Sequence, residues 1–358
     1  RAIESNCSIT PIRIGLSATV RPDTTAAKFL GGLDEHQRTR KVAIIRETST
    51  KETNITIRTL ADSIEGEDDT IEKIVGEIGN LMNTEKGSMV IFHNTRRSAE
   101  KTAYQLIEKG HDSVMPHHGS LGLDVRRTAE ERLKEGSLKA IVSSTSLELG
   151  LDIGLVDLVC QISSPKDAGR LLQRFGRSGH TLKGSSRGIL FPINGPDLLE
   201  SMAVVRAAQK GKLKKLTVPA NPLDVLGQFI IGISLKTGGS NKKEIWDIAR
   251  STYPFRNLKT RELRSLLDLL TKRLMGPNSV SPRLWYDSTM DTYIPRRNTR
   301  QAFYLNCGTI PKETTYKVVD EKNHRHLGDL SWDFGETLYE RDVILMGSRP
   351  LRIIGFSG

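Results

Sequence analysis

The sequence predicts an α/β fold in which a parallel sheet wrapped by helices precedes a smaller helical domain. Between Asp69 and Pro192, short apolar runs alternate with segments of helical spacing, the pattern of strands connected by helices. From Pro222 the pattern becomes helical three times over, and a segment rich in aromatic residues follows. A chain of 358 residues is also too long for one ordinary core and suits two or three domains.

The first part of the chain reads as a strand, a loop and a short helix. A β-like stretch from Ile9 to Ile14 precedes Gly15-Leu16-Ser17-Ala18-Thr19-Val20, and a helix is expected through Ala26 to Leu30. The segment from Thr39 to Leu60 is rich in alternating β-branched residues, which predicts further strands.

Two strand-and-helix units open the α/β region. Ser88-Met89-Val90-Ile91-Phe92-His93-Asn94-Thr95-Arg96 is an apolar run that ends in a polar turn, and Ser98 to Glu108 has helical spacing. Pro116-His117-His118-Gly119-Ser120-Leu121 precedes a charged helix from Asp124 to Glu135. The paired histidines lack a third ligand at suitable spacing, so we expect no metal there. Gly119 would instead allow a phosphate to approach the backbone.

Two later segments have residues suited to phosphate chemistry. The run from Lys139 to Thr145 is apolar and ends in three hydroxyl-bearing residues. This pattern is typical of a buried parallel strand whose carboxyl end meets a ligand. Asp152 follows two residues after Gly150. Gln173-Arg174-Phe175-Gly176-Arg177-Ser178-Gly179-His180 interleaves arginines with small residues. A guanidinium presents a planar fork of donors and can neutralise charge on a transferring phosphoryl group. Taken alone, such a segment is more often a basic, glycine-containing surface turn than a phosphate site.

The remainder of the chain predicts a winged-helix domain. Residues 196–210 indicate a connecting helix, and the basic run 210–215 is more typical of a solvated loop than of a phosphate site. Helices are expected at 223–235, 242–251 and 260–273, followed by a two-stranded ribbon within 280–294. Thr260 is expected to cap the third helix, whose outer face carries Arg261 and Arg264. We expect Trp246 and Trp285 to be core residues rather than base-stacking platforms.

Composition restricts the class of protein. A formal charge of +11 and a pI near 9.5 favour a polyanionic partner such as nucleic acid. Cys7, Cys160 and Cys307 are far apart and odd in number, so neither a disulfide framework nor a zinc site is expected. No apolar run approaches the roughly 20 residues that span a bilayer, so we expect a cytoplasmic protein without a membrane partner.

The order of these motifs resembles that of superfamily 2 helicases. Their individual residues resemble most closely those of the Lhr (large helicase-related) family. The ending Arg177-Ser178-Gly179-His180 is typical of Lhr. A second similarity lies at Tyr304-Leu305-Asn306-Cys307-Gly308-Thr309-Ile310-Pro311 and at Gly328-Asp329-Leu330. The resemblance extends from about Ile9 to about Ile354.

The resemblance implies a domain order. Residues 1–36 would be the tail of a first RecA-like lobe, and 37–195 a second RecA-like lobe. Residues 196–295 would contain a linker helix and the winged-helix domain, and 296–358 the truncated beginning of a β-rich Lhr-specific domain. The implied activity is ATP-dependent translocation, in the 3′-to-5′ direction, on single-stranded DNA or on DNA or RNA–DNA duplexes, with a role in DNA repair.

The resemblance also implies site residues. Arg177, as the arginine finger, and Gln173 would be catalytic. ATP would be bound or sensed by Arg174, Gly150, Asp152 and His180. Ser17 and Thr19 would couple the lobes. Nucleic acid would be bound by Thr95, Arg96, Gly119, Ser120, Ser144 and Thr145, and also by Arg261 and Arg264.

One departure from the family pattern is an absence. The sequence contains no Gly-x-x-x-x-Gly-Lys-Ser/Thr phosphate loop and no Asp-Glu-x-His motif, which supply phosphate and Mg²⁺ contacts in such motors. We therefore expect ATP and Mg²⁺ to be bound mainly by a first lobe that this chain, which begins at Arg1, lacks. The isolated chain should then have no ATPase activity. The alternative is a non-enzymatic winged-helix module with a decayed α/β lobe, and a nuclease is poorly supported because no tight acidic cluster is evident.

Overall fold

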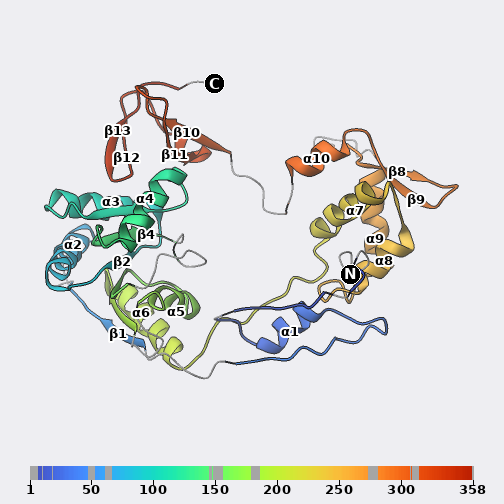
Figure 1. The fold of residues 1–358 in the computed structure, drawn as a ribbon, viewed down its shortest axis with the longest axis horizontal. Helices are drawn as coiled ribbons and strands as arrows, with labels where there is room; N and C mark the ends of the chain where they lie inside the picture. Colours follow the sequence, from blue (N-terminus) through green and yellow to red (C-terminus); the bar gives the residue numbers. More distant parts are fainter. Residues whose placement is uncertain are drawn as a thin grey trace. The chain divides into compact units, whose positions relative to one another are not determined.

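The computed structural model describes residues 7–9, 11–17, 19–46, 53–60, 67–144, 147, 156–178, 186–272, 281–306, 308 and 314–356. The chain divides into two compact units (Figure 1). One unit consists of Arg1–Arg46 and Lys215–Lys312, which we call the helical unit. The other consists of Glu47–Lys214 and Glu313–Gly358, which we call the sheet unit.

The sheet unit is built on six strands in the order β1-β6-β5-β2-β4-β3, all paired in parallel. The strands are β1 (Thr53–Ile57), β2 (Met89–Phe92), β3 (Val114–His117), β4 (Ala140–Ser143), β5 (Leu158–Ile162) and β6 (Ser186–Phe191). The residues of β2, β4 and β5 are all buried. Continuous apolar strands of this kind are expected where helices cover both faces of a sheet.

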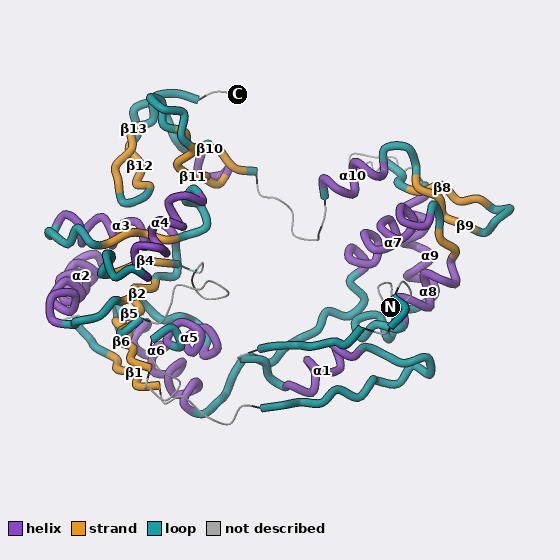
Figure 2. The backbone as a smooth tube through the Cα atoms, viewed as in Figure 1, coloured by secondary structure: helices purple, strands orange, loops and turns teal. Residues whose placement is uncertain are grey.

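Five helices, visible among the strands in Figure 2, cover the two faces. They are α2 (Glu67–Thr84), α3 (Arg96–Glu108), α4 (Leu123–Lys134), α5 (Ala168–Phe175) and α6 (Gly195–Gln209). Because side chains alternate along a strand, Met89 and Ile91 join a core with α2 and α3, whereas Val90 and Phe92 join a second core with α4, α5 and α6. The predicted α/β fold is confirmed.

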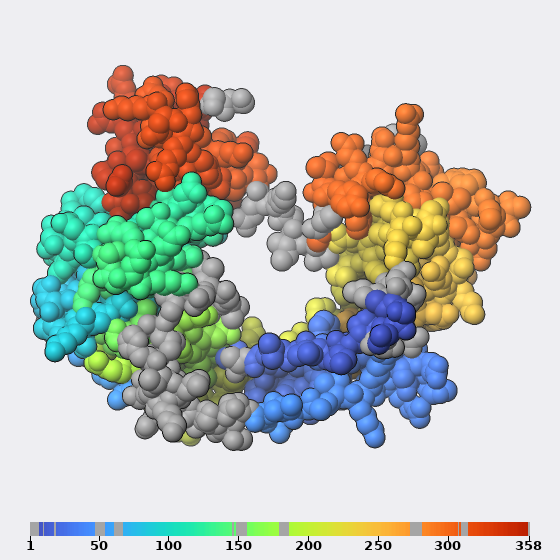
Figure 3. Space-filling view, viewed as in Figure 1, coloured from blue at the N-terminus to red at the C-terminus, as the bar shows by residue number. Residues whose placement is uncertain are grey.

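The C-terminal segment of the sheet unit is β-rich, as predicted. It consists of the antiparallel pair β10 (Thr315–Val319) and β11 (His326–Ser331), the short helix α11 (Trp332–Gly335), and the antiparallel pair β12 (Val343–Met346) and β13 (Arg349–Arg352). This segment, residues 314–356, packs on α3 and on the loop before α4 (Figure 3).

The helical unit contains a winged-helix domain, which confirms the prediction. Its elements are α7 (Leu223–Thr237), β7 (Ser240–Asn241), α8 (Lys242–Arg250), α9 (Thr260–Thr271), β8 (Leu284–Asp287) and β9 (Thr292–Pro295). The strand β7 joins the predicted ribbon as a third strand. Leu226, Ile230, Ile245, Leu263 and Leu267 are core residues. The unit also contains α1 (Asp23–Gly31) and α10 (Thr299–Leu305).

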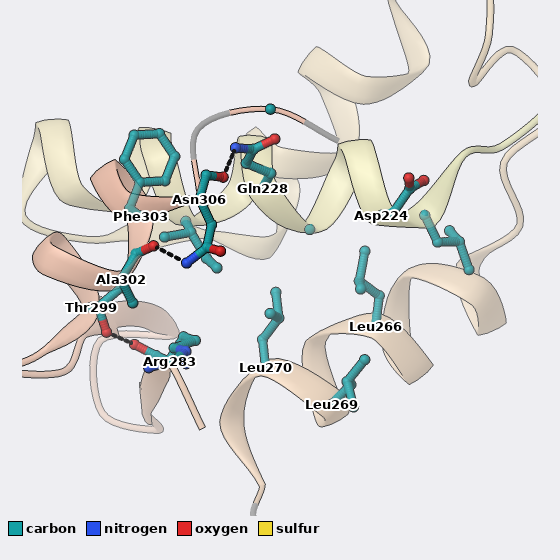
Figure 4. A pocket seen from close by; sticks show the side chains of 14 residues that line it. Asp224, Gln228, Leu266, Leu269, Leu270, Arg283, Thr299, Ala302, Phe303 and Asn306 are labelled. Atoms are coloured by element: carbon teal, nitrogen blue, oxygen red, sulfur yellow. Dashed lines mark hydrogen bonds between the residues drawn. The ribbon is translucent and has the colours of Figure 1, made fainter. Parts of the chain in front are cut away.

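A pocket of about 490 Å³ lies between α7, α9 and α10 of the helical unit (Figure 4). It is lined by Leu266 and Leu270 on one side and by Phe303 on the other. At its rim, the Gln228 amide donates to the Asn306 carbonyl at 2.7 Å. The pocket therefore reflects the packing of α10 against the winged-helix core.

Several expectations about individual elements were wrong. Residues 11–17 and 19–46 contain no strand, and Ile9, Ile12 and Ile14 are at least 77% exposed, because a β-branched segment forms a strand only where a partner strand is available. In contrast, the helix expected over residues 196–210 is present as α6, and it packs on α5 within the sheet unit. Residues 299–305, expected in a β-rich domain, form the helix α10 on α7.

Two side-chain expectations in the helical unit were also wrong. The N-cap of α9 is Lys259 rather than Thr260, and the Glu262 carboxylate accepts a hydrogen bond from the Lys259 N–H at 2.7 Å. Trp285 is 50% exposed and therefore not a core residue. Trp246 is half-buried against the core, with the Arg250 guanidinium 5.6 Å from its ring.

Candidate nucleotide and nucleic-acid interface

The carboxyl ends of three neighbouring strands lie in register at one edge of the sheet. Phe92 at the end of β2 pairs with Ser143 at the end of β4, which pairs in turn with His117 at the end of β3. The loops that follow these strands must therefore emerge side by side. They carry five of the predicted strand-binding residues that the structure describes: Thr95, Arg96, Gly119, Ser120 and Ser144.

The structure places four of these residues at or near the surface. Thr95, Arg96 and Gly119 are exposed, and Ser120 is half-buried. Arg96 Nη1 donates to Ser120 Oγ at 2.7 Å, which joins the loop after β2 to the loop after β3. Thr95 caps α3, since its hydroxyl accepts from the Ser98 N–H at 3.1 Å. A Cβ on Gly119 would meet no atom within 4 Å, so its backbone is open to approach.

Ser144 differs from the other four residues. Only 3% of its surface is exposed, because it follows directly on a fully buried strand. Its neighbour Ser143 is also buried and donates from Oγ to the His117 carbonyl at 2.9 Å. Ser144 is therefore buried at the end of β4, unlike the other four residues, and its contact with a strand stays a prediction.

Helix α5 and the turn after it position Gln173 and Arg177. The Asp167 carboxylate caps α5 by accepting from the Arg170 N–H at 3.0 Å. After the helix ends, the Arg177 N–H donates to the Arg174 carbonyl at 3.2 Å, and the Arg177 carbonyl accepts from the Val156 N–H at 3.0 Å. Gln173 and Arg177 are both half-buried. The backbone of Arg177 is thus held by hydrogen bonds, while the residue retains accessible surface.

A glycine that the sequence did not single out positions the end of α5. A Cβ on Gly188 of β6 would lie 2.3 Å from the ring of Phe175. Only glycine therefore allows the Phe175 ring, which is fully buried, to lie flat on the strand. This contact fixes the last turn of α5, immediately before the Arg177 turn.

Arg174 lies in the interior, which is at odds with its predicted contact with ATP. Its residue exposure is 0%. Arg174 Nη1 donates to Gln161 Oε1 at 2.6 Å and to Asn94 Oδ1 at 3.2 Å, and its guanidinium lies 5.1 Å from the Phe92 ring. Such contacts compensate the desolvation of a planar, weakly hydrated cation. Arg174 therefore ties α5 to the ends of β2 and β5.

Two buried histidines at this edge are electrically neutral at neutral pH. Burial, and secondarily the charge of Arg174, lower the pKa of His93 to about 3. Its Nε2 lies 2.9 Å from the Thr102 hydroxyl. Burial also lowers the pKa of His117, although the hydrogen bond to Glu130 opposes this shift. Positive charge at the edge therefore comes from arginine rather than from these histidines.

The remaining predicted site residues fall in three groups. Thr145, Gly150, Asp152 and His180 lie outside the described residues. Ser17 is exposed and Thr19 half-buried, both in the helical unit. Arg261 and Arg264 are exposed on α9, whereas its other face buries Leu263 and Leu267.

Sequence reasoning missed the residues that organise this edge, namely Asn94, Gln161, Glu100 and Gly188. One signal was available, because Gln161 interrupts the apolar strand Leu158–Ile162 and is fully buried. A buried polar side chain requires a hydrogen-bond partner, and here that partner is Arg174. The partner itself could not be inferred from the sequence.

Over the residues that the structure describes, no three His, Cys, Asp or Glu side chains are grouped as metal ligands. In the same part of the chain, every helix is too short or too polar to cross a bilayer.

Comparison with known proteins agrees with this architecture. Residues 69–181 match the helicase conserved C-terminal domain, and residues 206–357 match the winged helix domain of large helicase-related protein. The chain is 36% identical over 358 residues to the ATP-dependent helicase Lhr-Core of Saccharolobus solfataricus, covering 97% of this chain and 40% of that protein. It is 30% identical over 399 residues to the Lhr helicase/uracil glycosylase of Escherichia coli, covering 95% of this chain and 25% of that protein.

A solved structure is similar over most of the chain. The structure of Mycobacterium smegmatis helicase Lhr bound to ssDNA and AMP-PNP superposes with a TM-score of 0.77 at 31% identity, covering 88% of this chain and 41% of that one. The chain spans about 40% of the length of the archaeal relative named above. The order of motifs, the fold and both domain matches agree, and the chain belongs to the Lhr (large helicase-related) family of superfamily 2 ATP-dependent helicases.

Proposed function

We propose that this chain forms the part of an ATP-driven helicase motor that supplies an arginine finger and the contacts to one nucleic-acid strand. The observation that carries the proposal is the anchoring of the Arg177 turn. Hydrogen bonds hold its backbone at both sides, to Arg174 and to Val156, while the residue keeps accessible surface. An arginine finger needs this combination, because its guanidinium must be positioned and must still reach a second body.

The residue types at this turn suit a triphosphate. Arg177 would neutralise charge on the γ-phosphoryl oxygens, and Gln173, one helical turn earlier, would orient water or phosphate. Arg174 would act indirectly by fixing the turn. When bound, ATP supplies the free energy of phosphoryl transfer, and Mg²⁺ would be held by another lobe. Asp152, Gly150 and His180 would sense the nucleotide, and Ser17 and Thr19 would transmit closure between lobes.

The exposed edge formed by Thr95, Arg96, Gly119 and Ser120 would hold the sugar–phosphate backbone. Contacts of this kind fix a strand without reading its bases, which suits a motor that steps along any sequence. Arg261 and Arg264 on α9 would add electrostatic attraction. We propose single-stranded DNA, or one strand of a DNA or RNA–DNA duplex, as the substrate, with 3′-to-5′ movement in DNA repair.

The test of the finger is Arg177→Ala in the intact polypeptide. Loss of one finger should lower ATP turnover by roughly 10³-fold, with strand affinity nearly unchanged. Arg127→Ala is a matched control, because Arg127 is exposed on α4 and has no proposed role at the site. Normal ATP turnover in the Arg177→Ala enzyme would remove this residue from the active site.

The chain of 358 residues should itself lack ATPase activity, because its sequence contains no phosphate loop. The measurement is phosphate release by the purified chain with and without single-stranded DNA. ATP turnover that DNA stimulates would contradict the proposal that another lobe binds the phosphates and Mg²⁺.

A further inference from the structure

Glu100 is a buried carboxylate that the mechanism above does not use. It lies on α3, one helical turn after Arg96, and only 5% of its surface is exposed. A buried carboxylate requires several hydrogen-bond donors. Glu100 has three, and they come from two parts of the sheet unit that are more than 200 residues apart in sequence.

The first donor belongs to the loop after β3. His118 Nε2 lies 2.8 Å from Glu100 Oε1. Because a carboxylate only accepts hydrogen bonds, His118 is the donor. His118 immediately precedes Gly119 and Ser120, two of the proposed strand contacts. Arg96 and Glu100 therefore hold this loop from the same helix, Arg96 through the Ser120 hydroxyl and Glu100 through the His118 ring.

The other two donors belong to the hairpin β12–β13. The Gly347 N–H donates to Glu100 Oε1 at 2.8 Å, and the Ser348 N–H donates to Oε2 at 2.6 Å. Both residues form the two-residue turn of the hairpin and have positive φ, +65° and +58°, as a type I′ turn requires. A positive φ is unfavourable for serine. The hydrogen bond to Glu100 stabilises this conformation and holds the turn against α3.

A second set of contacts joins the same two parts through their backbones. The Asp329 N–H donates to the Ser120 carbonyl at 2.7 Å, and the Gly122 N–H donates to the Leu327 carbonyl at 2.9 Å. Between them, Leu121 and Gly328 form an antiparallel bridge. A Cβ on Gly328 would lie 2.3 Å from the Ser120 carbonyl oxygen, so this approach requires glycine. The pairing adds residues 120–122 to the edge of β11.

We propose that Glu100 is a positioning residue that links the loop 118–120 to the hairpin β12–β13, so that the C-terminal segment 314–356 braces the strand-contact loop of the sheet unit. The effect on strand affinity rests on the function proposed for that loop. The brace itself does not depend on that function, because it concerns only which backbone segments are held together. Figure 1 shows β12 and β13 beside α3, where the brace requires them.

The test uses Glu100→Gln in the full chain, with Glu108→Gln as a matched control. Glu108 is exposed on the same helix and its substitution removes the same charge. A glutamine offers one acceptor oxygen in place of two. Its amide NH₂ group only donates, so it would face one of the N–H donors without a hydrogen bond. Hydrogen exchange measured by mass spectrometry should become at least about tenfold faster in peptides covering 118–122 and 343–349, since hydrogen bonds to a charged group are lost. Exchange in the control should match that of the unsubstituted chain.

A second variant separates positioning from general loss of structure. His118→Ala removes one of the three donors and leaves the Gly347 and Ser348 bonds in place. Exchange should then rise in 118–122 and stay unchanged in 343–349. Faster exchange throughout the sheet unit in this variant would overturn the proposal, as would unchanged exchange of both peptides in Glu100→Gln. If Glu100→Gln does not fold, the proposal is tested by His118→Ala alone, through faster exchange in 118–122 with unchanged exchange in 343–349.

Strand affinity provides the link to function. Fluorescence anisotropy with labelled single-stranded DNA should show affinity about three- to tenfold weaker in Glu100→Gln. The salt dependence should be unchanged, because no phosphate-binding cation is removed. Faster exchange together with unchanged affinity would support the brace and refute the role of the loop in strand contact. Unchanged exchange would refute the brace and leave the proposed function standing.

Discussion

Acid should destabilise the sheet unit through His93, the residue that follows β2. Its ring is buried, and burial together with the charge of Arg174 lowers its pKa from 6.5 to about 3. In the unfolded chain the ring regains its ordinary pKa. Between those two values the unfolded chain binds one more proton than the folded chain. The contribution to stability is therefore fully present above pH 6.5 and is lost as the pH falls towards 3.

The size of the effect follows from the displacement of the pKa. Each pH unit below the unfolded pKa costs about 1.4 kcal/mol of unfolding free energy. His93 alone should therefore remove about 2 kcal/mol between neutral pH and about pH 5, and about 3.4 kcal/mol by about pH 4. His93→Gln keeps a neutral hydrogen-bonding side chain beside the Thr102 hydroxyl and does not titrate. Between neutral pH and about pH 5 or about pH 4, the His93→Gln variant should therefore lose about 2 or about 3.4 kcal/mol less unfolding free energy than the unsubstituted chain.

The assay is native-state hydrogen exchange of a β2 peptide at increasing urea, measured at several pH values. A local reporter is needed because a chain with two compact units does not unfold in one step. His324→Asn is a suitable control, since His324 is exposed in the same unit and asparagine tolerates its positive φ of 54°. Equal acid sensitivity of the His93→Gln variant and the unsubstituted chain would refute the assignment of a neutral, buried His93.

Two other sets of substitutions probe the packing of α5 and the charge of α9. Gly188→Ala should destabilise the sheet unit by about 3 kcal/mol, because the added Cβ would lie 2.3 Å from the Phe175 ring. In contrast, Gly76→Ala on α2, where a Cβ meets no atom within 4 Å, should stabilise it by up to about 1 kcal/mol. Hydrogen exchange of the β2 peptide at increasing urea checks the opposite signs in both variants, and destabilisation of equal size would contradict the steric argument. The double substitution Arg261→Ala and Arg264→Ala should lower the slope of log affinity against log salt for single-stranded DNA by about 1.4. An unchanged slope would remove α9 from the strand interface, and Lys236→Ala with Lys243→Ala, on other helices of the same unit, is the charge-matched control.

The periodicity of the sequence was sufficient to predict the two kinds of architecture. Runs that are apolar throughout, such as Met89–Phe92, or apolar up to a final serine, such as Ala140–Ser143, form strands covered on both faces. The leucines of α9 at helical spacing form the winged-helix core. Such patterns are local, because the side chains that share one face recur at a fixed spacing along the chain. The isoleucines at 9, 12 and 14 have the same local character but remain exposed, since no strand pairs with them among the described residues.

The sequence by itself determined the order of motifs and the family resemblance. Only the tertiary structure decided which charged residues are accessible. Arg174 and Arg177 are three residues apart in one motif, yet Arg174 is fully buried on Gln161 and Asn94 whereas Arg177 keeps accessible surface. The link from Glu100 to Gly347 and Ser348 likewise joins residues almost 250 positions apart. Burial and hydrogen bonding at such distances depend on how segments meet in space, and no local pattern of residues encodes that.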